Sequence, residues 1–275
     1  MIWEAVFGAG DLLFPPLFAD GHASLVFNLG LTLVADGLWQ RDSGGCYGRV
    51  IGAVSRADQV SAECPAMIGV YFHAAQVPSF TLVPAYELTD RIVALADLWG
   101  RAASELSVQL AEMDEAARVD CLESVLLRRI GNGPSSSSAV NVPDLTASVV
   151  QWRGRVTTEH LANKAGVSRQ QLARLFRDRL GISPKLYCRL ARFQSGLAYA
   201  GLGKGVDWAQ VALELGYTDQ SHMIAEFREF SGLTPQMLAT QRWFHPFIER
   251  AKLRHPCLKR EPGDPGDPGT DPESV

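Results

Sequence analysis

Long hydrogen-bonding side chains gather in two short stretches of the chain. The first stretch holds two arginines and two glutamines, and the second a glutamine, a serine and a histidine: Arg169, Gln170, Gln171, Arg174, Gln220, Ser221 and His222. An arginine can donate two hydrogen bonds at once to the O6 and N7 atoms of guanine, and a glutamine can pair with adenine in the same two-pronged way. The chemistry open to these residues is therefore recognition of base edges. Because arginine and glutamine are also good helix formers, an ordinary solvated helix face is the alternative.

A repeated pattern surrounds both stretches. The first copy reads Leu161, Ala162, Gly166, Ser168, Phe176, Gly181 and Pro184. The second copy reads Val211, Ala212, Gly216, Asp219, Phe227, Gly232 and Pro235. The copies are offset by 50 residues up to the first glycine and by 51 from the serine or aspartate onward, so one residue is inserted in the turn. Such a match marks one supersecondary unit that is used twice.

Each copy predicts two helices separated by a tight turn. Gly166 and Gly216 can adopt the left-handed backbone that the turn requires, and Ser168 and Asp219 are good N-caps for the second helix. The buried stripe expected on the second helices is Leu172, Phe176 and Arg179 in one unit and Met223, Phe227 and Phe230 in the other. The opposite, exposed stripe is Gln170, Arg174 and Arg177 in one unit and Ser221, Ala225 and Arg228 in the other. This is a helix-turn-helix, whose second helix enters the major groove of DNA.

The stretch Asp144–Arg242 resembles the DNA-binding domain of the AraC/XylS transcription regulators. The resemblance rests on two such units joined by a helix like Lys185–Tyr199, on the run Gly-Tyr-x-Asp-Gln-Ser-His and on the ending Phe-x4-Gly-x2-Pro. It implies that both second helices lie in successive major-groove segments on one face of the DNA. The resemblance implies phosphate contacts from Arg177, Lys185 and Arg228. It implies base contacts from seven residues: Arg169, Gln170, Gln171, Arg174, Gln220, Ser221 and His222. The chain departs from several relatives at Ala225, where they carry a contacting arginine, which puts hydrogen-bonded readout by the second unit in doubt.

The net charge of −4 conceals a division along the chain. Residues 1–144 carry a net charge of −9, residues 145–260 a net charge of +10, and residues 261–275 a net charge of −5. A basic domain beside an acidic one fits a protein with a single nucleic-acid-binding face. A charge pattern that serves solubility alone is the ordinary alternative.

The N-terminal part predicts an α+β fold. Apolar or β-branched runs at 24–29, 49–51 and 67–73 are broken by glycines, which favours strands of a small antiparallel barrel or sandwich within residues 1–85. From about Leu88 the pattern turns helical, with a stripe of Val119, Leu122, Leu126 and Ile130. This arrangement resembles the cupin-like sensing domain of AraC-type regulators. The domains expected are thus an effector-sensing or dimerisation domain over 1–130, a flexible Ser/Pro/Gly linker over 131–143, an all-α DNA-binding domain over 144–255 and a disordered tail over 256–275.

Other chemistries lack their usual residues. His22 and His73 are the histidines of the N-terminal half, and they form no His-x-His pair of the kind that metal-binding cupins use. No basic residue or histidine stands beside Cys46 or Cys64 to activate a thiol, and the sequence has no Gly-x-Ser-x-Gly elbow. Gly8-Ala9-Gly10 lacks the third glycine of a dinucleotide-binding loop. We therefore expect no enzyme activity, no metal and no cofactor.

The expected function is that of a sequence-specific transcription regulator of the AraC/XylS type. Its expected partners are double-stranded DNA, a small-molecule effector, a second copy of the chain, and RNA polymerase if it activates transcription. Five scattered cysteines favour a reducing cytoplasm, and the absence of an apolar run of about 18 residues argues against a membrane span. The start of the sequence does not predict a secretory signal. The competing hypothesis is a small-molecule-binding protein or an enzyme with a vestigial helix-turn-helix domain.

Overall fold

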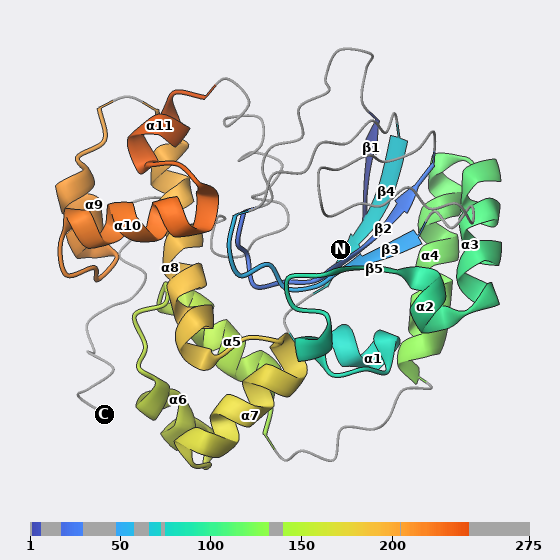
Figure 1. The fold of residues 1–275 in the computed structure, drawn as a ribbon, viewed down its shortest axis with the longest axis horizontal. Coiled ribbons are helices and arrows are strands. Elements are labelled where there is room, and N and C mark those ends of the chain that lie inside the picture. The colour runs from blue at the N-terminus through green and yellow to red at the C-terminus, as the bar shows by residue number, and fades with distance from the viewer. Residues whose placement is uncertain are drawn as a thin grey trace.

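The computed structural model describes residues 2–6, 18–29, 48–57, 66–72, 75–131, 140–203 and 205–241. A β-sheet with helices against it occupies one side of the molecule, and a helical unit occupies the other (Figure 1). The mixed α and β content predicted from the sequence is thus confirmed. Most of the expected linker and the whole expected tail lie outside the described residues, as do His73, Cys46, Cys64 and the Gly8-Ala9-Gly10 run.

The sheet is antiparallel and has the strand order β1-β4-β2-β3-β5. Its strands are β1 (Ile2–Val6), β2 (Ser24–Asn28), β3 (Gly48–Ile51), β4 (Ala66–Tyr71) and β5 (Ile92–Ala94). In the register of the central pair, Leu25 lies opposite Val70 and Phe27 opposite Ile68, and all four side chains are buried. The three strand runs predicted from the sequence correspond to β2, β3 and β4. In the described residues β1 and β5 each pair with one neighbour, so the sheet is open there and does not confirm the cupin-like barrel.

Short helices and β5 depart from the sequence-based expectation. The helical region expected from Leu88 onward is wrong at Ile92–Ala94, because this segment is a strand that pairs with β3. Conversely, α1 (Val77–Thr81) lies in a region that was expected to hold strands and turns. Both segments are five residues or shorter, which is too short for a periodic pattern to separate helix from strand.

Three further helices pack beside the sheet in the described residues. They are α2 (Leu95–Trp99), α3 (Arg101–Glu112) and α4 (Glu115–Gly131), preceded by the 3₁₀ turn η1 (Ala85–Glu87). Leu122 and Leu126 of α4 are buried with Leu106 and Leu110 of α3 in the same core as the sheet. The predicted stripe on α4 therefore holds at its centre, but Ile130 at its end is 42% exposed.

Between residues 140 and 241, the described part of the C-terminal unit consists of seven helices. They are α5 (Val142–Gln151), α6 (Thr158–Ala165), α7 (Arg169–Leu180), α8 (Pro184–Ala200), α9 (Trp208–Glu214), α10 (Gln220–Ser231) and α11 (Pro235–Ala239). The long helix α8 runs through this unit, with α6 and α7 at one end and α9 to α11 at the other (Figure 1). Buried side chains along α8, including Tyr187, Phe193 and Leu197, join both ends into one hydrophobic core.

The two parts of the molecule share packing and hydrogen bonds. Phe18 and Ala19 lie in the core of the C-terminal helices, and the Phe18 ring meets that of Phe193 edge-on with centroids 6.2 Å apart. The backbone N–H of Ala19 donates to the carbonyl of Phe230 (3.0 Å), and the Gln194 amide donates to the carbonyl of Ala19 (3.0 Å). Since a buried polar group is costly without a partner, these bonds make this docking specific.

Candidate nucleic-acid interface

The first helix-turn-helix unit consists of α6 and α7. Thr157 caps α6, and Gly166 follows it in the left-handed conformation (φ 65°). Ser168 and Gln171 form a reciprocal capping box at the start of α7, because the Ser168 hydroxyl accepts from the Gln171 backbone (3.2 Å) and the Gln171 side chain accepts from the Ser168 backbone (2.9 Å). Such a box satisfies two backbone donors that the first turn of a helix leaves unpaired. The predicted turn and N-cap are thus confirmed.

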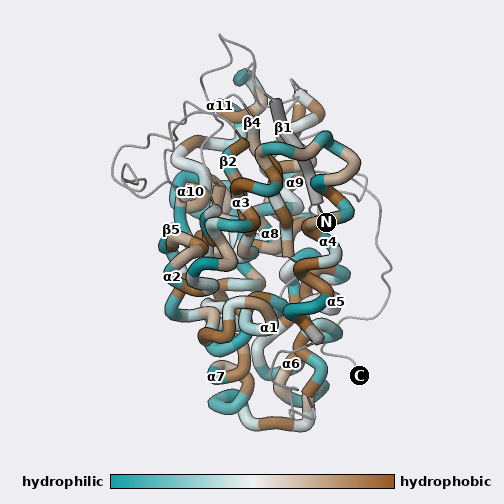
Figure 2. The backbone as a smooth tube through the Cα atoms, turned by 90° about the vertical axis from the view of Figure 1, so that its right-hand side faces the viewer, coloured by the Kyte–Doolittle hydropathy of each residue, from teal (hydrophilic) through white to brown (hydrophobic). Residues whose placement is uncertain are grey.

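The second unit, α9 and α10, repeats this geometry. The Asp219 carboxylate caps α10 by accepting from the His222 backbone N–H (2.8 Å), and Gly216 in the turn has φ 72°. Leu172 and Phe176 of α7 and Met223, Phe227 and Phe230 of α10 are fully buried, as predicted. Arg179 is half-buried at the edge of its stripe, and Leu180 completes the buried face. Hydropathy along α7 therefore alternates between teal and brown (Figure 2).

All ten residues predicted to contact DNA have exposed side chains. They are Arg169, Gln170, Gln171, Arg174 and Arg177 on α7, Lys185 on α8, and Gln220, Ser221, His222 and Arg228 on α10. Ala225 is exposed on the same face of α10. The structure places the predicted base-contacting residues in the first two turns of α7 and the first turn of α10. These are the positions from which a recognition helix contacts base edges.

Several of these side chains already have partners within the protein. The Gln171 oxygen is committed to the capping box, which leaves its amide N–H groups available to a ligand. Arg174 lies 3.7 Å from the Asp178 carboxylate, but 85% of its side chain is exposed, so this contact leaves it accessible. His222 lies 3.6 Å from Glu226 and edge-on to the Tyr217 ring, with centroids 5.4 Å apart.

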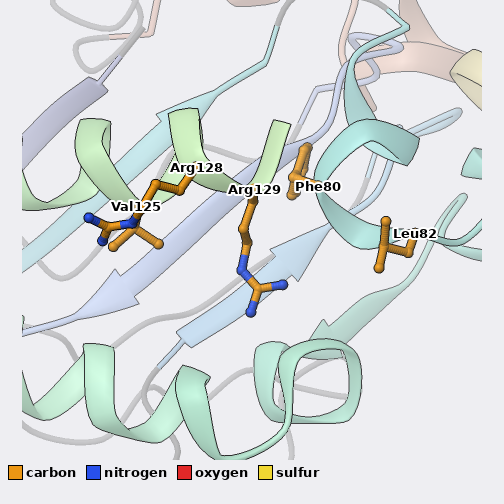
Figure 3. A pocket seen from close by; sticks show the side chains of 5 residues that line it. All are labelled: Phe80, Leu82, Val125, Arg128 and Arg129. Carbon is orange, nitrogen blue, oxygen red and sulfur yellow. The ribbon is translucent and has the colours of Figure 1, made fainter. Parts of the chain in front are cut away.

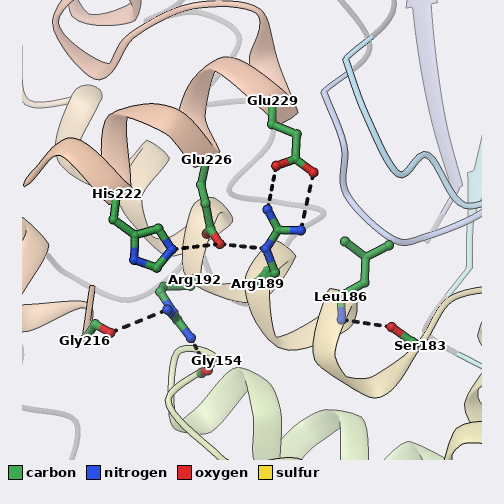
Figure 4. A network of polar contacts seen from close by, with 9 residues as sticks. All are labelled: Gly154, Ser183, Leu186, Arg189, Arg192, Gly216, His222, Glu226 and Glu229. Atoms are coloured by element: carbon green, nitrogen blue, oxygen red, sulfur yellow. Dashed lines mark hydrogen bonds and ion pairs between the residues drawn. The ribbon is translucent and has the colours of Figure 1, made fainter. Parts of the chain in front are cut away.

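An arginine on α8 holds the second recognition helix. The Arg189 Nε donates to Glu226 (2.7 Å), and its two terminal nitrogens donate to Glu229 (2.6 and 3.3 Å), as Figure 4 shows. Burial opposes the charge of Arg189, but the hydrogen bonds and charges of Glu229 and Glu226 raise its pKa. Because the Glu226 side chain is 4% exposed, its carboxylate depends on this arginine for compensation.

Arg192, one turn further along α8, joins the two units. Its terminal nitrogens donate to the carbonyl of Gly216 in the turn of the second unit (3.5 Å) and to that of Gly154 before α6 (3.3 Å). Its guanidinium carbon lies 5.1 Å from the centre of the Tyr217 ring. Arg189, Arg192 and Glu226 were not predicted as functional residues, since their partners are 24 to 40 residues away along the chain. The spacing of Glu226 and Glu229 on one helix face was the local signal that could have suggested a shared cation.

The N-terminal part contacts the end of the first recognition helix. The guanidinium carbon of Arg177 lies 4.3 Å from the centre of the Tyr86 ring, and the Thr89 hydroxyl donates to the carbonyl of Gly181 (2.9 Å). Arg177, a predicted phosphate contact, therefore has an aromatic partner in the N-terminal part. The residues in the first turn of α7 that are predicted to contact bases lie at the opposite end of the helix.

Groupings that would suggest other chemistry are not seen in the described residues. No cluster of three or more His, Cys, Asp or Glu side chains in this part of the chain could hold a metal ion. Burial raises the pKa of the Cys188 thiol to about 12, and such a protonated thiol is a poor nucleophile. Among the described helices, none has both the length and the apolar character needed to span a bilayer.

Comparisons with known proteins agree with this geometry. A family described as a helix-turn-helix domain matches residues 161–241. The HTH-type transcriptional regulator ArgR of Pseudomonas aeruginosa is 29% identical over 155 residues, which cover 54% of this chain and 42% of that protein. The chain thus spans less than half the length of this relative.

Solved structures of ToxT from Vibrio cholerae resemble the whole chain only remotely. One covers 87% of this chain and 96% of its own, with a TM-score of 0.43 and 9% identity. Another, of ToxT with a bound unsaturated fatty acid, covers 86% and 93% with a TM-score of 0.42 and 10% identity. The match to residues 161–241 concerns the same segment that the repeat and the capped helices identify.

Proposed function

We propose that this chain, whose C-terminal part is a helix-turn-helix domain of the AraC type, is a sequence-specific DNA-binding regulator of transcription that catalyses no reaction. The observation that carries the proposal is the pair of capped recognition helices, α7 and α10, with exposed polar faces and a shared supporting helix, α8. The net charge of +10 over residues 145–260 supports binding to a polyanion.

The two helices divide the readout unequally in this proposal. The first presents Arg169, Gln170, Gln171 and Arg174, and the second Gln220, Ser221 and His222 followed by Ala225. The base contacts come from these seven polar residues, and Arg177, Lys185 and Arg228 bind phosphates. Two helices on one DNA face read sites about one helical turn, ~34 Å, apart. The DNA half-site bound by α7 is then recognised more stringently than the one bound by α10. Ala225 on α10 can still favour a thymine by apolar contact with its methyl group.

The N-terminal part, on this proposal, is a sensing or dimerisation domain related to the cupin-like domains and binds a small organic effector without a metal. Its sheet and the helices beside it form a separate core that leaves the polar faces of α7 and α10 exposed. We propose a sensing domain over 1–130, a linker over 131–143, a DNA-binding domain over 144–255 and a tail over 256–275. The protein acts in the cytoplasm in this proposal. Stoichiometric iron, manganese or zinc bound to residues 1–130 of the purified protein would contradict the absence of a metal.

A binding selection on randomised DNA tests the main proposal. We expect the whole chain to enrich one sequence and to shift the gene's own upstream DNA at physiological salt. Arg174→Ala should cost about 1–3 kcal/mol at the preferred base, as loss of a bidentate contact does. Arg228→Ala should weaken all sequences alike and reduce the salt slope by about one. Enrichment of no sequence would overturn the proposal, and an altered base preference in Arg228→Ala alone would reverse the assigned roles.

A shorter fragment tests whether the DNA-binding domain is self-sufficient. Asn141 caps α5 by accepting from the Asp144 backbone, and Val142 is buried, so the fragment should begin at residue 140 and end near 255. Because α6 to α11 share a core along α8, we expect the fragment to fold and to bind DNA at about 100 mM salt. An unfolded fragment, or one without DNA affinity, would show that the N-terminal residues in this core are required.

A further inference from the structure

A hollow of about 410 Å³ lies between α1 and α4 in the N-terminal part. Its lining consists of three apolar residues and two arginines: Phe80, Leu82, Val125, Arg128 and Arg129. Figure 3 shows Phe80 and Leu82 on one side, Val125 and Arg128 on the other, and Arg129 between them. Cavities that bind small molecules usually measure about 300–1,000 Å³ and combine apolar walls with a few polar groups. The hollow has both properties.

Arg129 is a half-buried cation that has no anionic partner among the described residues. Its guanidinium carbon stacks 3.9 Å from the centre of the Trp99 ring, and Trp99 is held in place because its indole N–H donates to the carbonyl of Phe80 (3.0 Å). In the described part of the chain, no carboxylate pairs with Arg129 and no acceptor takes its N–H groups. Burial lowers the pKa of the Arg129 guanidinium. The Trp99 ring thus fixes the plane of a partly desolvated guanidinium whose N–H groups have no acceptor among the described residues.

Leu82 at the edge of the hollow is held in an unfavourable backbone conformation. It follows α1 as its C-cap with φ 63° and ψ 11°, a left-handed conformation that branched side chains rarely adopt. Its side chain is nevertheless 62% exposed, so packing within the protein does not explain why a leucine stands there. Strain of this kind tends to occur at ligand-binding positions. The leucine therefore offers apolar surface beside the unpaired guanidinium.

We infer that this hollow binds a small organic monocarboxylate with a short apolar chain. The planar guanidinium of Arg129 matches the two oxygens of a carboxylate, and such bidentate pairs are strong and directional. Arg128 adds positive charge at the same wall, and Leu82 and Val125 contact the apolar chain. The inference rests on the proposed function, since this ligand would be the effector of the regulator.

Calorimetric titration of the whole chain tests the inference with hexanoate and phenylacetate as probes and their uncharged amides as controls. We expect at least one acid to bind more tightly than its amide. Arg129→Gln should weaken that binding by roughly 10-fold to 100-fold, as loss of a charge-assisted hydrogen bond does. Arg129→Lys should restore only part of it, because an ammonium keeps the charge without the fork. Val125→Phe should abolish binding by filling the hollow while both arginines remain.

Arg101→Gln is the matched control, because Arg101 is an exposed arginine on α3 that pairs with Glu105. It should leave hexanoate and phenylacetate binding unchanged. The inference is overturned if neither acid binds at millimolar concentration, if acid and amide bind alike, or if Arg129→Gln and Arg101→Gln have equal effects. Circular dichroism and a DNA mobility shift on each variant establish that it is folded. Loss of the proposed function would appear separately, as failure of the wild-type chain to select a DNA sequence.

Discussion

Arg189 should stabilise the second recognition helix far more through Glu226 than through Glu229. The two carboxylates share one guanidinium at 2.7 Å and 2.6 Å, but the Glu226 side chain is 4% exposed and that of Glu229 is 50% exposed. Removing one partner of a buried ion pair leaves an uncompensated charge and costs about 3–5 kcal/mol. An exposed pair contributes about 0–1 kcal/mol. Distance alone would predict equal effects, whereas burial predicts unequal ones.

Comparison of single and double substitutions measures this difference in the free energy of unfolding. Arg189→Met should cost about 3–5 kcal/mol, because the Glu226 carboxylate, 4% exposed, then lies buried without its guanidinium partner. The double change Arg189→Met with Glu226→Leu should be less destabilising than Arg189→Met alone, since no buried charge remains. Glu229→Ala should cost less than about 1 kcal/mol.

Urea unfolding of the whole chain, followed by far-UV circular dichroism, gives these values from the midpoint and slope. In the DNA selection, Arg189→Met should weaken the base preference at the positions bound by α10 more than at those bound by α7. The reason is that Arg189 forms its ion pairs with residues of α10. Burial does not set the size of these effects if Arg189→Met costs no more than Glu229→Ala, or if adding Glu226→Leu makes the protein still less stable.

Two further predictions concern the contacts between the N-terminal and C-terminal parts, and a third concerns Asp20 in the N-terminal part. Tyr86→Ala frees Arg177 from its ring and should tighten binding to all DNA sequences by about two- to fivefold, the equivalent of about 0.5–1 kcal/mol, with no gain in an Arg177→Ala background. An added Cβ at Gly181 (φ 86°) meets Thr89 and Ala85, whereas one at Gly166 (φ 65°) meets nothing within 4 Å. Gly181→Ala should therefore destabilise the protein by more than the roughly 1–2 kcal/mol of left-handed strain expected for Gly166→Ala. Equal shifts in the melting temperatures of the two variants would contradict this. Burial raises the pKa of Asp20 to about 7 from 3.8, although hydrogen bonds from His22 and Tyr71 oppose the shift. Between pH 3.8 and about 7 the folded state then binds more protons than the unfolded state, so the contribution of Asp20 to stability falls as pH rises through this range. Asp20→Asn should therefore flatten the pH dependence of the free energy of unfolding by at most about 1.4 kcal/mol per pH unit.

Local signals in the sequence were sufficient to predict the two helix-turn-helix units. The caps at Ser168 and Asp219 and the buried positions of α7 and α10 follow from interactions within about four residues, which a single sequence displays directly. For the same reason, the helical periodicity alone placed the exposed polar faces of both helices correctly. The three central strands were recognisable because their runs are apolar and bounded by turn residues.

Tertiary structure alone decided how these units are held and what they contact. Arg189 meets carboxylates 37 and 40 positions away, and Arg177 meets an aromatic ring of the N-terminal part, so no local pattern could reveal either pairing. β5 is a strand because β3 offers it hydrogen bonds, and its own three residues carry too little periodicity to show this. The hollow beside Arg129 likewise exists only where α1 and α4 come together. Local propensity determines which helices form and which of their faces are polar, whereas burial and long-range pairing determine which polar groups remain available to a ligand.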